Sequence, residues 1–457
     1  MEAWAVAHAQ GAVFFRQGSR QSHLFSFFLE QGSGYSTRRK RVIMKQNKRL
    51  LLHIVVLSIC ILLGWESCIA LYFRLGFPIP IDLTFRYNEV SCAHQGIDPF
   101  DIFEHNISSE EFCGLDRPDF PYEEKNGKKI VHSYPAWHMA VFWWYGYVPK
   151  EVCIAIMIGL YLCSLLWSCY WTSKKLQKSD CLHYVVDILS LLAAMTIPFG
   201  CLCTTMNYGL FLLGCSLLLY NLLETQHTIL AGMVFSLIML KPQVGIPFLI
   251  PLFLNKKYQI IAIAGAICIA ETLFTSWQLN KSPIELILQI PQLGAPFQKG
   301  FFTNTATKVF GPVGQYLTIG GFLAIISVLS FLVRNAENIW VRFLPAIALV
   351  PFWTYSQEHD WLVTLPCYIY ILNNKDKYPR LYNLLPWLIA LCVLAIFFWF
   401  NGIYILGKHR ASTPLLLTLL SISCCMAVLD EKERWEIRFS PKDLFSQMSF
   451  WKTKKRK

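Results

Sequence analysis

The chain has 457 residues, of which 54% are hydrophobic and only 15% are charged, and its formal net charge is +12. Soluble proteins carry about 25% charged residues, so the composition excludes an ordinary soluble enzyme. The basic residues fall in short clusters between long apolar runs, as in the cytoplasmic loops of membrane proteins. We therefore expect an all-α polytopic membrane protein embedded in a lipid bilayer, with no nucleic-acid partner.

Residues 1–43 contain no apolar core long enough for a signal peptide. Met44, followed by basic residues and then by an apolar run, is typical of the natural start of a membrane protein. We expect residues 1–43 to be a flexible tail or an artefact of upstream translation. The transmembrane domain is then expected over residues 44–430, followed by a basic cytoplasmic tail over residues 431–457.

The apolar runs predict about twelve membrane spans, the first near residues 51–74 and the second near 150–172. The basic clusters alternate so that both termini are cytoplasmic and residues 75–149 form an outside loop. The other spans are expected near residues 183–199, 206–223, 227–240, 243–254, 258–276, 317–333, 339–355, 360–373, 382–402 and 412–429. The pair at 227–240 and 243–254 is short and interrupted by proline, which suits broken or re-entrant helices that line a cavity.

The stretch 78–100 directly follows the first span. Asp82 lies where the chain would leave the membrane, and Arg86 and Glu89 share a face with it if the segment is a helix. Gly96 and the following Asp-Pro pair are expected to end this helix. We interpret the stretch as an outward-facing amphipathic helix in a loop. The ordinary alternative is a solvated helix in which Arg86 simply pairs with Asp82 or Glu89.

Other ionisable residues also gather at the outer ends of the predicted spans, among them Lys241, Glu358, His359 and Asp360. An acid there could take a proton from an acceptor hydroxyl, and the cations could hold a phosphate leaving group. In the ordinary alternative, Lys241 reaches the lipid headgroups and His359 is an interfacial histidine. The acids in or near spans, which are Glu66, Asp187 and Glu271, are more typical of interhelical hydrogen bonds.

Most of the 16 cysteines lie inside apolar runs, where cysteine is a small apolar residue. Cys92 and Cys113 both fall on the first outside loop and could pair in an oxidising compartment. No cysteine or histidine spacing resembles a zinc site, and the chain offers no dedicated cluster of metal ligands. We therefore expect neither a metal nor a cofactor.

The ordered set of motifs resembles the polyprenol-phosphate-dependent glycosyltransferases of the GT-C fold. The resemblance is strongest to glycosyltransferase family 87, which includes the phosphatidylinositol-mannoside mannosyltransferases. The matching elements are Asp82, Gly96-Ile97-Asp98-Pro99-Phe100, Tyr134-Pro135-Ala136-Trp137, Lys241-Pro242-Gln243 and Ser356-Gln357-Glu358-His359-Asp360. Two departures are Ala136, where the family has a second proline, and Met206-Asn207-Tyr208-Gly209, where the family has Gly-Gln.

The resemblance implies a GT-C type helical bundle that moves a hexose, with mannose as one candidate, from a polyprenyl-phosphate donor to a glycolipid or glycan acceptor. Transfer would invert the sugar at the outer face of a bacterial inner membrane, in building the cell envelope. Asp82 would be the general base, and Lys241 and His359 would bind the donor phosphate. Arg86 would position Asp82 or contact the phosphate, and Glu89 would be a substitute base.

Two other functions remain open from the sequence. A twelve-span secondary transporter would have related halves and charged or broken segments at mid-membrane, whereas the charges here favour one face. That alternative would gain if Glu66, Asp187 and Glu271 faced one central cavity. A polymerase or ligase of surface polysaccharide would share the substrates but differ in its site.

Overall fold

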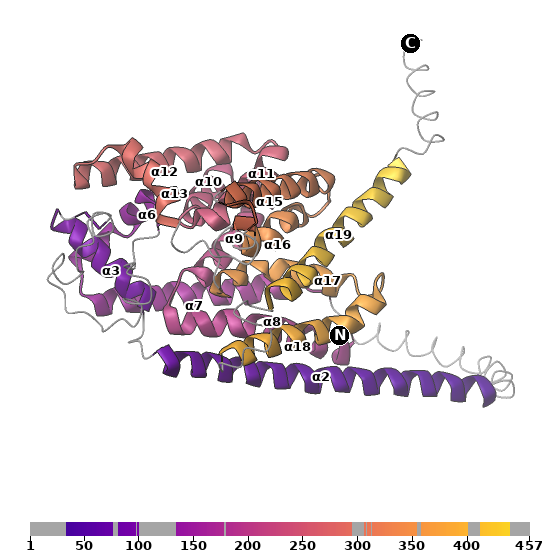
Figure 1. Cartoon of the computed structure of the whole chain (residues 1–457). Helices are drawn as coiled ribbons and strands as arrows, with labels where there is room; N and C mark the ends of the chain where they lie inside the picture. The colour runs from indigo at the N-terminus through magenta and orange to yellow at the C-terminus, as the bar shows by residue number, and fades with distance from the viewer. Residues whose placement is uncertain are drawn as a thin grey trace, which may run out of the picture. The chain divides into compact units, whose positions relative to one another are not determined.

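The computed structural model describes residues 33–75, 81–96, 98–99, 134–177, 180–294, 306–307, 309–311, 313–353, 358–400 and 412–438. Within these residues the regular structure is helical throughout and contains no strand (Figure 1), which confirms the all-α expectation. The chain divides into two compact units, one drawn from residues 1–55 and 179–186 and the other from 56–178 and 187–457.

The first unit contains the beginning of α2 (Ser33–Leu75) and the first turns of α8 (Cys181–Thr205). Its polar contacts join Asp180 Oδ1 to His183 Nδ1 at 2.5 Å, and His183 Nε2 to the amide of Gln46 at 3.5 Å. Helix α2 begins inside the segment to which the sequence assigns no fold. Residues 1–32 and 439–457 lie outside the described part of the chain.

Six helices of the described residues are long and apolar enough to cross a membrane, which supports a membrane protein. They are Met44–Ile69, Lys150–Lys175, Cys181–Cys203, Tyr258–Leu279, Val313–Leu332 and Pro379–Phe398. Four more apolar segments are shorter: Gly209–Glu224, Thr228–Ile238, Pro242–Leu254 and Ile339–Phe352. A span through the bilayer core takes about 20 helical residues, so the count of twelve spans stays a prediction.

The second unit is a packed assembly of helices. Helix α12 (Tyr258–Leu279) packs against α10 (Thr228–Ile238) and α6 (Ala136–Val141). Helix α9 (Gly209–Glu224) packs against α7 (Lys150–Lys175), α10 and the 3₁₀ helix η4 (Glu358–Thr364). The remaining elements are η1 (Trp143–Tyr147), α11 (Pro242–Leu254), α13 (Pro283–Gly294), α15 (Val313–Leu332), η3 (Ile339–Phe343), α16 (Leu344–Trp353), α17 (Leu365–Asn373), α18 (Pro379–Phe400) and α19 (Ser412–Arg438).

Helix α3 (Ile81–His94) follows α2 and ends as the sequence predicts. Gly96 has a φ of +73°, in the left-handed region that glycine adopts without strain just after a helix. The buried carboxylate of Asp98 forms an ion pair with Lys281. Cys92 is buried and disulfide-bonded. Because Cys113 lies outside the described residues, its pairing with Cys92 stays a prediction.

The turn between α8 and α9 is held from two sides. Met206 has a φ of +52°, which is uncommon for a residue with a side chain. The hydroxyl of Tyr161, on α7, donates to the carbonyl oxygens of Met206 and Asn207, at 2.8 and 2.9 Å. On the other side, a Cβ at Gly209 would overlap the carbonyl oxygen of His359 in η4. The turn is therefore fixed between α7 and η4.

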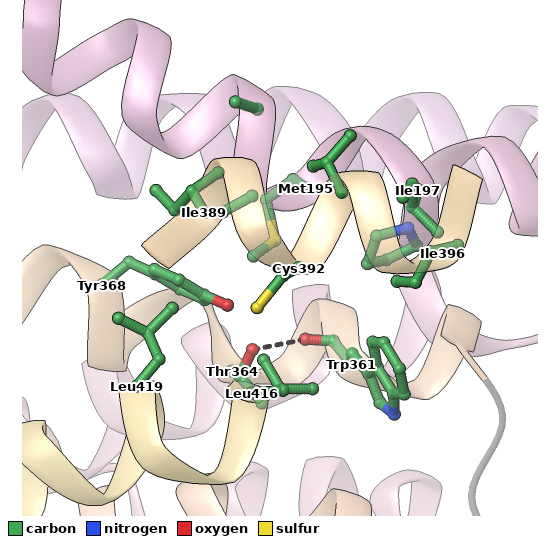
Figure 2. A pocket seen from close by; sticks show the side chains of 14 residues that line it. Met195, Ile197, Trp361, Thr364, Tyr368, Ile389, Cys392, Ile396, Leu416 and Leu419 are labelled. Carbon is green, nitrogen blue, oxygen red and sulfur yellow. Dashed lines mark hydrogen bonds between the residues drawn. The ribbon is translucent and has the colours of Figure 1, made fainter. Parts of the chain in front are cut away.

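Helix η4 also forms part of the wall of an apolar pocket (Figure 2), together with residues of α8, α17, α18 and α19. Cys392 and Tyr368 point into this pocket, and the hydroxyl of Thr364 donates to the carbonyl oxygen of Trp361 at 2.6 Å. No charged residue is among its lining residues in the described part of the chain. The later residues of η4 therefore lie in an apolar environment.

Gly209→Ala tests the close approach of α9 and η4. We expect this variant to lose about 1–3 kcal/mol of stability, because the added methyl overlaps the carbonyl of His359. The measurement is the midpoint of thermal unfolding in detergent. Gly159→Ala, in α7, is the matched control, because nothing lies within 4 Å of the added Cβ. Equal midpoints for the two variants would contradict the contact.

Candidate active site

Five segments of the second unit bring polar side chains together. Two of them are the first turn of α3 and the residue two positions before α6. The other three are the α8–α9 turn, the residue just before α11 and the start of η4. The cluster consists of Asp82, Tyr134, Asn207, Lys241, His359 and Asp360. Except for Asp82, which is partly exposed, these residues are buried.

Asn207 lies at the centre of the cluster. Its side-chain nitrogen donates to Asp82 Oδ2 at 2.5 Å and to the hydroxyl oxygen of Tyr134 at 3.3 Å. Its side-chain oxygen accepts from Lys241 Nζ at 2.5 Å. An ammonium has only donors and a carboxylate has only acceptors. The amide can therefore satisfy both neighbours in this one orientation.

Lys241 is 2% exposed and forms an ion pair with Asp360, at 2.6 Å between Nζ and Oδ1. Burial by itself would lower the pKa of Lys241, but the attraction of Asp360 outweighs it and raises the pKa above its ordinary value. Lys241 is therefore charged. Its Nζ also lies 3.3 Å from Nε2 of His359. Because the ammonium can only donate, we assign Nε2 as the acceptor of that hydrogen bond.

Two cations lie close to the ring of Tyr134. The guanidinium carbon of Arg86 is 4.7 Å from the ring centroid, and Lys241 Nζ is 5.9 Å from it, within the range of cation–π attraction. Burial raises the pKa of Tyr134, so its phenol stays protonated. Arg86 also pairs with Glu89 at 2.6 Å, which is the helix pairing that the sequence allows.

Aromatic rings fix the position of Tyr134. It stacks on His138 with centroids 4.4 Å apart and meets Tyr208 edge-on at 5.8 Å. Tyr208 in turn stacks on Phe142 at 4.9 Å. Such contacts add about 0.5–1.5 kcal/mol each beyond the burial of area. The ring that both Arg86 and Lys241 approach is thus held in place.

The structure brings together three of the five predicted site residues, Asp82, Lys241 and His359, in one hydrogen-bonded network. Arg86 and Glu89 lie beside it and reach it through the ring of Tyr134. Lys241 is bound inside the protein, which differs from the ordinary alternative of a side chain directed at headgroups.

Sequence reasoning gave no role to Asn207 or Tyr134, and it counted Asp360 only among the ionisable residues at the outer ends of the predicted spans. Asn207 interrupts two apolar runs, and Tyr134 and Asp360 each stand in a motif. Those positions only weakly indicate a site residue, because the contacts that place each residue in the site are with residues far away in the chain.

The acids that bear on the transporter alternative have different surroundings. Asp187 is fully buried and bonded to Lys375 at 2.8 Å and to the hydroxyl of Tyr382 at 2.9 Å. Glu66 is exposed and Glu271 is partly exposed. None of the three lines the pocket of Figure 2. Within the described residues, no group of three His, Cys, Asp or Glu side chains has the arrangement of a metal site.

A model of glycosyltransferase family 87 matches residues 132–364, slightly more than half of the 457 residues. No curated protein and no solved structure matches the chain. The matched region contains Tyr134, Asn207, Lys241 and the first residues of η4. Asp82 precedes it and is joined to it by the hydrogen bond from Asn207.

Lys241→Met tests the buried ion pair. We expect a loss of about 3–5 kcal/mol in stability, because Asp360, at 1% exposure, is left without its cation. Thermal unfolding in detergent measures this loss, and the double variant Lys241→Met with Asp360→Leu is expected to recover most of it. The matched control is Lys175→Met, which removes the half-exposed pair with Glu224 and costs no more than about 1 kcal/mol. A loss for Lys241→Met as small as that of the control would contradict the pairing.

Proposed function

The chain belongs to glycosyltransferase family 87 and is a glycosyltransferase, and on that premise we propose a specific reaction for it. It transfers a hexose, with mannose as one candidate, from a polyprenyl-phosphate donor to a hydroxyl group of a glycolipid or glycan acceptor. Its helices form a GT-C type bundle, and transfer takes place at the outer face of the membrane with inversion of the sugar. One observation carries the proposal: Asn207, inside the matched region, binds the carboxylate of Asp82.

Asp82 is the proposed general base. Glu89 is occupied by Arg86, and Asp360 is occupied by Lys241. Within the described residues Asp82 makes no ion pair, and its hydrogen bond comes from the neutral amide of Asn207 on one oxygen, Oδ2. Its other carboxylate oxygen is left for the hydroxyl of the acceptor. Asp82 is also the most exposed carboxylate of the cluster, as contact with a substrate requires.

The reaction balances with these groups alone. The carboxylate of Asp82 takes the proton from the acceptor hydroxyl as the oxygen attacks C1 of the sugar. The bond from C1 to the phosphate oxygen breaks, and the polyprenyl phosphate leaves with the electron pair. Attack opposite the leaving group inverts C1. The proton ends on Asp82 and is passed to solvent or to the departing phosphate.

Lys241, His359 and Arg86 are proposed to stabilise the negative charge on the leaving phosphate. An ammonium has three donors, and those of Lys241 are directed at Asn207, Asp360 and His359. A phosphate oxygen that reaches Lys241 must therefore replace one of them. His359 Nε2 is the partner at the longest distance, 3.3 Å, and it carries no charge when it accepts. Released from Lys241, the imidazole can itself donate to the phosphate.

Asp82→Asn tests the base. We expect transfer to fall by at least about 10²-fold, because the amide cannot accept the proton. The assay uses purified protein in lipid nanodiscs with a panel of polyprenyl-phosphate sugars and lipid acceptors. Ser91→Ala, on the same helix, is the matched control, since among the described residues its hydroxyl bonds only the carbonyl of Tyr87, at 2.9 Å. Transfer by Asp82→Asn at the rate of the control would remove Asp82 from this role.

A further inference from the structure

We infer that Asn207 is a positioning residue for the reaction: its amide orients Asp82 and couples it to the Lys241–Asp360 pair. The inference rests on the proposed role of Asp82 as the base. It concerns a residue that contacts no reacting atom and acts through its neighbour.

The carboxylate of Asp82 depends on Asn207 for its hydrogen bonding. Within the part of the chain that the structure describes, Asn207 is the single hydrogen-bond donor to Asp82, and the bond is short, at 2.5 Å. Asn207 is 4% exposed, so water does not readily replace it. A hydrogen bond donated to a carboxylate stabilises its ionised form. The amide thus holds the carboxylate of Asp82 in one orientation before it reacts.

The amide of Asn207 cannot turn over. Rotation by half a turn would place the NH₂ group against the ammonium of Lys241 and the carbonyl oxygen against the carboxylate of Asp82. Both contacts would then be repulsive. Because Lys241 is fixed by Asp360 at 2.6 Å, the orientation of the amide follows from a buried ion pair on the opposite side. The orientation of Asp82 is therefore set by Asp360 of η4, through the side chains of Lys241 and Asn207.

The backbone that carries Asn207 is also fixed. The hydroxyl of Tyr161 donates to the carbonyl oxygens of Met206 and of Asn207 itself. Gly209 closes against η4, where no side chain would fit. The amide thus projects from a turn that is held on both sides, as a group that must be placed to within a fraction of an ångström requires.

The ionisable groups that face Asp82 come from several elements. Helix α3 contributes Arg86 and Glu89, α7 contributes Tyr161, and Tyr134 precedes α6; Lys241, His359 and Asp360 complete the set through Asn207. Substitution of Asn207 by alanine removes none of these ionisable groups. A change in the pH dependence of the reaction therefore reports the loss of the amide itself.

The experiment measures kcat/KM for the acceptor against pH for the purified protein in nanodiscs, with Asn207→Asp and Asn207→Ala. Asn207→Asp keeps the shape and the bond from Lys241 but lacks the N–H donor. We expect the acid limb of the profile to move to higher pH by about one pH unit for Asn207→Ala, because a charge-assisted hydrogen bond to the carboxylate is lost. Asn207→Asp should move it further, because a second carboxylate faces Asp82. Ser216→Ala, a buried hydroxyl on α9 that bonds the carbonyl of Leu212, is the matched control and should leave the limb unchanged.

Lower activity with an unmoved acid limb would show that Asn207 has only a structural role and would overturn the inference. If both Asn207 variants fail to fold, Tyr161→Phe replaces them, because it loosens the turn and keeps the amide. It should move the limb in the same direction by a smaller amount, and an unmoved limb would again overturn the inference. Asp82→Asn is measured in parallel. Active Asp82→Asn refutes the base itself, whereas inactive Asp82→Asn with unmoved Asn207 profiles refutes only the positioning role.

Discussion

A buried ammonium, that of Lys241, is the constraint on which the site depends. A charge in an apolar interior is tolerated only when it is paired and hydrogen-bonded. Within the described residues, Lys241 bonds Asn207, Asp360 and His359, which come from the α8–α9 turn and from η4. These segments must therefore meet at the start of α11. Asp82 is bonded to this group through Asn207. The amide oxygen of Asn207 accepts from Lys241, so its nitrogen is on the opposite side and donates to Asp82.

Helix η4 connects this polar cluster to an apolar region within a single short segment. Its first residues, His359 and Asp360, are bonded to Lys241, whereas Trp361 and Thr364 belong to the wall of the pocket in Figure 2. Gly209 lies against its backbone. The ion pair that begins in η4 is in turn bonded, through Asn207, to Asp82. We regard η4 as the element through which the helices around the pocket position the chemistry.

The helices could be predicted from the sequence because apolar runs are a local signal. The runs near 150–172 and 258–276 correspond to α7 and α12, whose C-terminal ends lie three residues later than predicted. Gly96 ends α3 as expected, because a left-handed residue after a helix is also a local requirement. Asp82, Lys241 and His359 could be chosen because charges at the ends of apolar runs are costly and therefore informative.

Other features could not be predicted, because they depend on partners distant in the chain. Asn207 is neutral, and its importance arises only when Asp82 and Lys241 lie on either side of it. Tyr134 is placed near two cations by the packing of rings on α6 and beside α9. Apolar composition also cannot separate a short buried helix from a membrane span, and α10 and α11 are of the shorter kind.

The most direct test of the account is an experimental structure of the protein in nanodiscs with a polyprenyl-phosphate sugar bound. The account predicts that the phosphate contacts Lys241 or His359, and that C1 of the sugar faces the oxygen of Asp82 that Asn207 does not bind. The hydrogen bonds from Asn207 to Asp82 and from Lys241 to Asn207 should be present in that complex. A sugar bound away from Asp82, or an Asp82 carboxylate separated from Asn207 with the donor in place, would contradict it.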